Sequence, residues 1–174
     1  MDSKSENHKV LKTSWIDTPL GRMLVVADDE GLYLLEFVDR RGLEKEIERL
    51  KKKTKRPIIP GKPNPAKQIE EELEGYFSGK IREFKTPLLL IGSPFQKRVW
   101  EELQKIPKGE TRSYTEIAKA IGKPSAFRAA GSANGANQLA IVIPCHRVIN
   151  SNGGLSGYGG GIKRKEWLLK HERK

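Results

Sequence analysis

Cysteine is almost absent from this chain, which has a single one, Cys145, among its 174 residues. One cysteine excludes an internal disulfide and any metal site built from several thiolates, and it suits a reducing compartment. The sequence also lacks an apolar run near the roughly 20 residues that a membrane-spanning helix needs, and it shows no signal-peptide pattern. We therefore expect an intracellular protein with no membrane association.

Acidic residues are scarce in one half of the chain. Residues 1–85 contain 18 Lys/Arg and 16 Asp/Glu, whereas residues 86–174 contain 15 Lys/Arg and only 6 Asp/Glu. Nearly all of the formal net charge of +11 therefore lies in the second half. This asymmetry favours a polyanionic partner for that half, although a generally basic surface explains the same composition.

The first half has the turn and strand signals of an antiparallel meander, followed by helical segments. Turn residues at 18–21 and 28–31 separate strand-forming segments within residues 12–38. Residues 43–53 and 65–78 carry apolar side chains at helical spacing, and prolines between them mark a loop. We predict an α/β (α+β) N-terminal domain over residues 1–85, with a small antiparallel sheet and a supporting role, and an extended connection over residues 86–92.

The second half, residues 93–174, has the signals of a mainly helical domain. Capping boxes at Ser93 and Ser113 each predict the start of a helix. A glycine turn then leads to a further helix from Ser125 to about Asn134. Two short helices around such a turn form a helix-turn-helix, which either places its second helix on DNA or serves only for packing.

The second helix of this pair carries nearly all small side chains, and Arg128 is its one large polar side chain. A helix that reads bases in the major groove normally carries several Arg, Asn or Gln side chains. Because that set is missing, we favour sequence-independent binding, in the minor groove, with Arg128 as a probe.

Cys145 follows an apolar segment, residues 139–143, which we predict to be a buried strand. A thiol becomes a nucleophile as its thiolate, which nearby imidazole and cationic groups favour. His146 and Arg147 come directly after the cysteine, so Cys145 is a candidate nucleophile. An inert buried cysteine is the alternative, since adjacency along the chain does not bring side chains together.

Two features downstream of the cysteine also have two interpretations. The glycine-rich segment 150–161, which contains Tyr158, suits either a pocket wall or a flexible linker. The last helix, residues 163–172, ends at Glu172, which is either solvated or folds back to orient a histidine.

The sequence Ile-Pro-Cys-His-Arg-Val at residues 143–148 resembles the active-site motif of the O6-alkylguanine-DNA alkyltransferases, also called methylated-DNA–protein-cysteine methyltransferases. The similarity covers about the last eighty residues, and it includes Arg128 and the small-residue helix, Asn137, the loop with Tyr158 and the motif at 165–169. The N-terminal half resembles the family only in its strand-then-helix layout. The resemblance implies a DNA repair enzyme that moves an alkyl group from O6 of guanine to Cys145, once and irreversibly.

The resemblance also implies a winged helix-turn-helix-like C-terminal domain that binds double-stranded DNA containing O6-alkylguanine and flips the damaged base out. Cys145 would attack the alkyl carbon, His146 would act through a water as its base, and Glu172 would orient His146. Asn137 would hold the active-site turn, and Tyr114 would donate a proton or hydrogen bond to the leaving guanine. The DNA contacts that we expect come from Arg128, Tyr114, Thr115, Lys123 and Ser151, and the substrate pocket from Val148, Tyr158, Gly159 and Trp100.

Several positions depart from many relatives: Gly159 replaces a hydroxyl residue, Asn134 a larger apolar one and Gln138 a proline. These departures bear on the rate and on the alkyl groups accepted. Some relatives bind zinc through Cys and His in the N-terminal half. This chain has no Cys in that half and only one His, His8, so we expect no metal and no cofactor. We expect a monomer without an obligate protein partner, located in the cytoplasm and on the nucleoid in use, or in the nucleus of a eukaryote.

Two other functions remain open from the residues themselves. A DNA-binding module that recognises alkylation without reacting would share the basic half and the helix-turn-helix. A cysteine hydrolase or redox sensor would use Cys145 and His146, but it would explain neither Arg128 nor the charge asymmetry.

Overall fold

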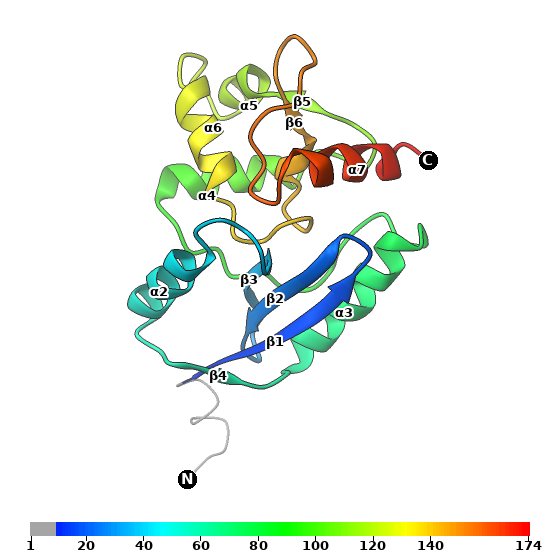
Figure 1. Cartoon of the computed structure of the whole chain (residues 1–174). Helices are drawn as coiled ribbons and strands as arrows, with labels where there is room; N and C mark the ends of the chain where they lie inside the picture. The colour runs from blue at the N-terminus through cyan, green and yellow to red at the C-terminus, as the bar shows by residue number, and fades with distance from the viewer. Residues whose placement is uncertain (1–9) are drawn as a thin grey trace. The chain divides into compact units, whose positions relative to one another are not determined.

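The structure is a computed structural model that describes residues 10–174 (Figure 1). The chain divides into two compact units with the boundary between Ile91 and Gly92. Among the described residues, no helix is both long and apolar enough to cross a membrane.

The N-terminal unit is built on a four-stranded sheet in the order β3-β2-β1-β4. Its strands are β1 (Leu11–Thr18), β2 (Gly21–Ala27), β3 (Leu32–Phe37) and β4 (Ile58–Pro60). The first three pair antiparallel, which confirms the meander, but β4 pairs parallel with β1. The sheet is therefore mixed, and the prediction of an antiparallel sheet is wrong for this edge. The proline-rich segment contains the three-residue strand β4, which lies at the edge of the sheet, where proline is tolerated.

Helices cover this sheet on both faces. Val25 and Val26 are consecutive on β2, so they point to opposite faces, and both are fully buried. Helix α2 (Leu43–Thr54) packs its Leu50 into the same cluster as Val26, and α3 (Asn64–Phe77) contacts β1 and β2. The α/β character predicted for this unit is confirmed.

Two buried glutamates and a partly buried arginine lie between β3 and α2. Arg40 forms an ion pair with Glu36 and a second one with Glu46, at 3.1 Å. The second carboxylate oxygen of each glutamate has no hydrogen-bond partner among residues 10–174. Burial raises the pKa of Glu36 to about 8, against the influence of Arg40, and raises that of Glu46 as well.

The C-terminal unit is mainly helical, as predicted. Helices α4 (Pro94–Leu103), α5 (Tyr114–Ala120) and α6 (Phe127–Gly135) pack against one another, and α7 (Ile162–Glu172) ends the chain. The short strands β5 (Arg112–Ser113) and β6 (Val148–Ile149) pair in parallel. The α5–α6 pair is the predicted helix-turn-helix.

The predicted helix starts are only partly reproduced. The capping box at Ser93 is complete, with both reciprocal hydrogen bonds to Gln96. At Ser113 one bond is present, from the backbone N–H of Glu116 to the hydroxyl at 3.1 Å. Helix α6 begins at Phe127, two residues later than Ser125.

The prediction of a buried strand over residues 139–143 is wrong. The segment is buried, but it folds into a turn, closed by the N–H of Ile143 donating to the carbonyl of Leu139 at 2.9 Å. Ile141 has a φ of 71°, a left-handed conformation that is rare for a β-branched residue. A short apolar run indicates burial but does not distinguish a strand from other buried backbone.

Candidate functional site

Cys145 is the first residue of a 3₁₀ turn, η1 (Cys145–Arg147), and Pro144 separates it from the buried turn at 139–143. Its thiol is not part of a disulfide, and the residue is 7% exposed. Its backbone carbonyl accepts a hydrogen bond from the Asn134 side chain on α6, at 3.3 Å. The cysteine backbone is therefore tied to the second helix of the helix-turn-helix.

Asn137 holds both ends of the turn that precedes Cys145. Its Nδ2 donates to the carbonyls of Ile143 at 2.9 Å and of Leu139 at 3.4 Å, and its Oδ1 accepts from the N–H of Leu139 at 2.9 Å. One buried amide thus satisfies three backbone groups that a strand would have paired with a neighbour. Such a clamp lets the chain keep the left-handed Ile141 and carry Cys145 to the start of η1.

His146 and Glu172 meet although they are 26 residues apart. The Nε2 of His146 lies 2.8 Å from Oε2 of Glu172, and both side chains are buried. An ionised carboxylate only accepts hydrogen bonds, so Nε2 carries the proton and Nδ1 is the acceptor. Nδ1 has no hydrogen-bond partner within the described part of the chain.

Arg147 completes this buried cluster. The sequence analysis considered Arg147 only as a neighbour of the cysteine. Its guanidinium binds Glu172 through two hydrogen bonds, at 2.8 and 2.9 Å, and donates to the carbonyl of Ile106 at 2.6 Å. A bidentate pair of this kind fixes the plane of the carboxylate. Glu172 therefore has a defined orientation toward His146.

The pKa values follow from burial and from these contacts. Burial alone would raise the pKa of Glu172, but the hydrogen bonds from His146 and Arg147 outweigh it and hold that pKa well below its usual range. Burial lowers the pKa of His146, against the opposing effect of Glu172. His146 is consequently a neutral imidazole at neutral pH, with Nδ1 able to take up a proton.

Lys165 on α7 is fully buried. Its ammonium donates to the carbonyls of Val148 at 2.7 Å and of Ser156 at 3.0 Å. Burial lowers the pKa of Lys165, and the charge of Cys145 acts in the opposite direction. A cation near a thiol is an arrangement that favours a thiolate. The sequence contained Lys165 within a family motif, but nothing local signalled its burial.

Tyr114 and the glycine-rich loop meet at the carbonyl that Lys165 also binds. The Tyr114 hydroxyl donates to the Ser156 carbonyl at 3.2 Å. The pKa of Tyr114 is raised by burial and then by the charge of Cys145. Tyr114 at the start of α5, Lys165 on α7 and the loop thus surround the region of the cysteine.

The other residues predicted to line the substrate pocket differ in their burial and in their contacts. Val148 is fully buried on β6, and the ring of Tyr158 lies edge-on to the ring of His146, with 6.5 Å between centroids. Gly159 is exposed in the loop. Trp100 is buried, and its indole N–H donates to the carbonyl of Ala133 at 2.8 Å, so it fastens α4 to α6.

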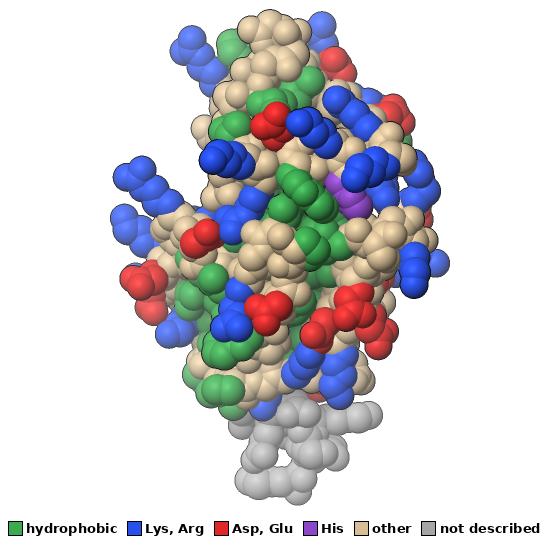
Figure 2. Space-filling view, turned by 45° about the vertical axis from the view of Figure 1, so that its right-hand side comes forward, with side chains coloured by type: hydrophobic (Ala, Val, Ile, Leu, Met, Phe, Trp, Pro, Cys, Tyr) green, Lys and Arg blue, Asp and Glu red, His purple; other side chains and the backbone are tan. Residues whose placement is uncertain are grey.

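The residues predicted to contact DNA lie on the helix-turn-helix and the loop after β6. Lys123, Arg128 and Ser151 are exposed, and Tyr114 and Thr115 are half-buried at the start of α5. Figure 2 shows Lys and Arg side chains spread over the C-terminal unit, in the upper part of the view. Phe127, which the sequence analysis did not single out, is a large side chain that is 45% exposed at the start of α6.

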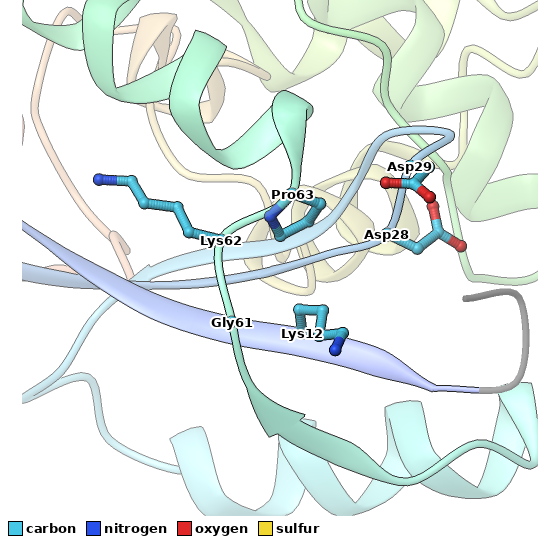
Figure 3. Close-up of a pocket in the computed structure, with 6 residues that line it drawn as sticks. All are labelled: Lys12, Asp28, Asp29, Gly61, Lys62 and Pro63. Carbon is cyan, nitrogen blue, oxygen red and sulfur yellow. The ribbon is translucent and has the colours of Figure 1, made fainter. Parts of the chain in front are cut away.

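The N-terminal unit has a small polar pocket (Figure 3), whose lining residues include no cysteine or histidine. Asp28 in its wall is engaged by the Tyr33 hydroxyl at 2.9 Å and by Arg56 at 3.0 Å. In Figure 3 the side chain of Lys62 points away from Asp28 and Asp29. Within residues 10–174, no group of three or more His, Cys, Asp or Glu could hold a metal ion, and His8 lies outside the described residues.

Comparison with known proteins covers both units. Residues 94–174 match the family described as 6-O-methylguanine DNA methyltransferase, DNA binding domain. Residues 11–90 match 6-O-methylguanine DNA methyltransferase, ribonuclease-like domain.

Whole-chain relatives carry a consistent name. The methylated-DNA–protein-cysteine methyltransferase of Mycolicibacterium paratuberculosis is 46% identical, over 91% of this chain and 90% of the relative. That of Methanosarcina barkeri is 45% identical, over 90% and 94%. The crystal structure of the Mycobacterium tuberculosis O6-methylguanine methyltransferase aligns with a TM-score of 0.82 and 40% identity, over 94% of this chain and 93% of that one. The Mycobacterium tuberculosis protein in complex with DNA aligns with a TM-score of 0.79 and 42% identity, over 94% and 92%.

Proposed function

The chain belongs to the methylated-DNA–protein-cysteine methyltransferase family, and on that premise we propose how its own residues carry the reaction. The protein is a DNA repair methyltransferase that binds DNA and transfers the methyl group of O6-methylguanine to its own cysteine. The family and the activity predicted from the sequence are thereby confirmed. The cysteine is Cys145, since the chain has no other.

The observation that carries the residue assignment is the buried chain of contacts beside Cys145. His146 presents an acceptor nitrogen that no described residue engages, while its Nε2 is bound by Glu172, which Arg147 holds in turn. In the proposed step, His146 takes the thiol proton through a bridging water. The thiolate sulfur then forms a bond to the methyl carbon, and the bond from that carbon to O6 breaks. The electron pair leaves with the guanine.

Two further groups act on the charges that develop in this step. The ammonium of Lys165 stabilises the thiolate before transfer, and the hydroxyl of Tyr114 donates a proton or hydrogen bond to the departing guanine. Asn137 keeps the turn that delivers Cys145 in place. Backbone groups of Cys145, Val148 and Gly159 recognise the guanine edge, and the ring of Tyr158 packs on it. Because water does not cleave the thioether product, each molecule acts once.

DNA binding is assigned to the C-terminal unit, with a supporting role for the N-terminal one. The small-residue helix α6 approaches the minor groove, the modified guanine rotates out of the duplex, and Arg128 fills the gap. Thr115, Lys123 and Ser151 contact the backbone of the same duplex. The partner is therefore double-stranded DNA containing O6-alkylguanine, with no obligate protein partner, and the place of action is wherever the genome lies.

An intact-mass experiment tests this assignment. The protein is mixed with a duplex carrying one O6-methylguanine, weighed, and the modified peptide is mapped. We expect a stoichiometric gain of one methylene mass on Cys145 and restored guanine, and we expect Cys145→Ala to bind the duplex without any gain. Tight lesion binding by the unaltered protein without a mass gain would instead support a damage-recognition module. Methylation of the Cys145→Ala variant would refute the nucleophile.

A further inference from the structure

We propose that Phe127 is a second probe of the duplex, whose ring stacks on a base next to the nucleotide displaced by Arg128. The inference rests on the proposed function, in which α6 enters the minor groove.

The exposure of Phe127 is the first observation. Its side chain is 45% exposed, and it belongs to the few large hydrophobic residues on the described surface that are open to this degree. The other exposed residues of α6 are small, apart from Arg128. A large aromatic ring on an otherwise lean helix protrudes beyond its neighbours, so it is among the first groups of α6 to meet a surface that approaches the helix.

The flank on which Phe127 lies is the second observation. Gly131 is four residues further along α6, so it occupies the same side of the helix one turn later. A Cβ atom added at Gly131 would lie 3.6 Å from the ring of Tyr114. Phe127 therefore lies on the flank of α6 that faces the start of α5, where Tyr114 is proposed to act on the extruded guanine.

The contact between Phe127 and Arg128 is the third observation. The Cζ of Arg128 lies 5.8 Å from the centroid of the Phe127 ring, within the range of a cation–π interaction. The two planar groups are thus presented together at the N-terminus of α6. When Arg128 enters the base stack it leaves the phenyl ring, and the ring can then exchange the guanidinium for the face of a flanking base. Apolar side chains wedged beside a base step are a known device of minor-groove binding.

The test compares Phe127→Ala and Phe127→Leu with the unaltered protein on a duplex that carries O6-methylguanine and a fluorescent 2-aminopurine beside it. Trp15→Ala is the matched control, because Trp15 is an exposed aromatic side chain of the N-terminal unit with an arginine, Arg22, also 5.8 Å from its ring. Binding affinity, 2-aminopurine fluorescence and single-turnover methyl transfer are measured, and transfer from the free base O6-methylguanine serves as the reference rate.

We expect Phe127→Ala to lose about tenfold in affinity for the lesion duplex, within the range that base–aromatic stacking supplies. The 2-aminopurine signal on binding should change with it, and the ratio of the duplex rate to the free-base rate should fall. Phe127→Leu should keep part of the affinity but lose the ring-dependent fluorescence change, while Trp15→Ala should match the unaltered protein. Unaltered affinity and fluorescence in Phe127→Ala would overturn the inference, as would an equal loss of rate on duplex and free base. Absence of transfer by the unaltered protein would instead overturn the proposed function.

Discussion

Replacing Glu36 by glutamine should remove a pH-dependent penalty from the stability of the N-terminal unit. Glu36 is fully buried, and it shares the guanidinium of Arg40 with Glu46. Three ionised groups would leave one negative charge uncompensated in the interior, so burial raises the pKa of Glu36 from 4.5 to about 8. Glutamine keeps the shape and an oxygen acceptor for Arg40, but it has no proton to lose.

The sign and size of the effect follow from linkage. Between pH 4.5 and 8 the folded protein holds the Glu36 proton more tightly than the unfolded chain does, so stability falls as pH rises through this window. At about 1.4 kcal/mol per pH unit, the loss reaches roughly 3 kcal/mol by pH 7 and levels off at about 5 kcal/mol above pH 8. Because the glutamine of the Glu36→Gln variant does not titrate, the stability of that variant relative to the unaltered protein should rise by these amounts over the same window.

Urea unfolding followed by circular dichroism at a series of pH values between 4.5 and 9 would measure this difference. Glu48→Gln is the control, because Glu48 lies on α2 in an exposed ion pair with Lys51, of a kind that contributes at most about 1 kcal/mol. Its difference from the unaltered protein should be nearly independent of pH in this range. Parallel stability curves for the unaltered protein and Glu36→Gln across the whole range would refute the reasoning.

Other predictions concern the site itself. Glu172→Gln removes the charged partner of Arg147 and His146, so unfolding should show a loss of about 3–5 kcal/mol, and single-turnover methyl transfer should slow; an unchanged stability would mean that the cluster is not a coupled unit. Lys165→Met should shift the pH profile of Cys145 alkylation by iodoacetamide to higher pH, and an unmoved profile would exclude its electrostatic role. Arg128→Ala should slow transfer from duplex DNA more than from the free base, whereas equal slowing would refute base flipping. Affinity for duplex should fall with rising salt, because phosphate contacts release counterions, and a flat salt dependence would contradict binding through the basic surface.

The features that the sequence determined by itself are those with local signals. Capping residues and turn glycines act within a few positions, which is why α4, α5 and the antiparallel meander could be predicted from the residues alone. The motif around Cys145 identified the chemistry because its residues are contiguous. Local signals do not determine the exact residue at which a helix begins. Helix α6 accordingly begins at Phe127 and not at the predicted Ser125.

Tertiary structure decided the features that depend on distant partners or on burial. The parallel pairing of β4, the bond from His146 to Glu172 across 26 residues, and the burial of Lys165 under the loop have no counterpart in local spacing. Residues 139–143 show the reason: an apolar run reports that a segment is buried, but only its neighbours determine its backbone. Here the Asn137 side chain supplies the hydrogen bonds that a sheet would have supplied, and the same apolar residues therefore form a turn that carries Cys145 into the site.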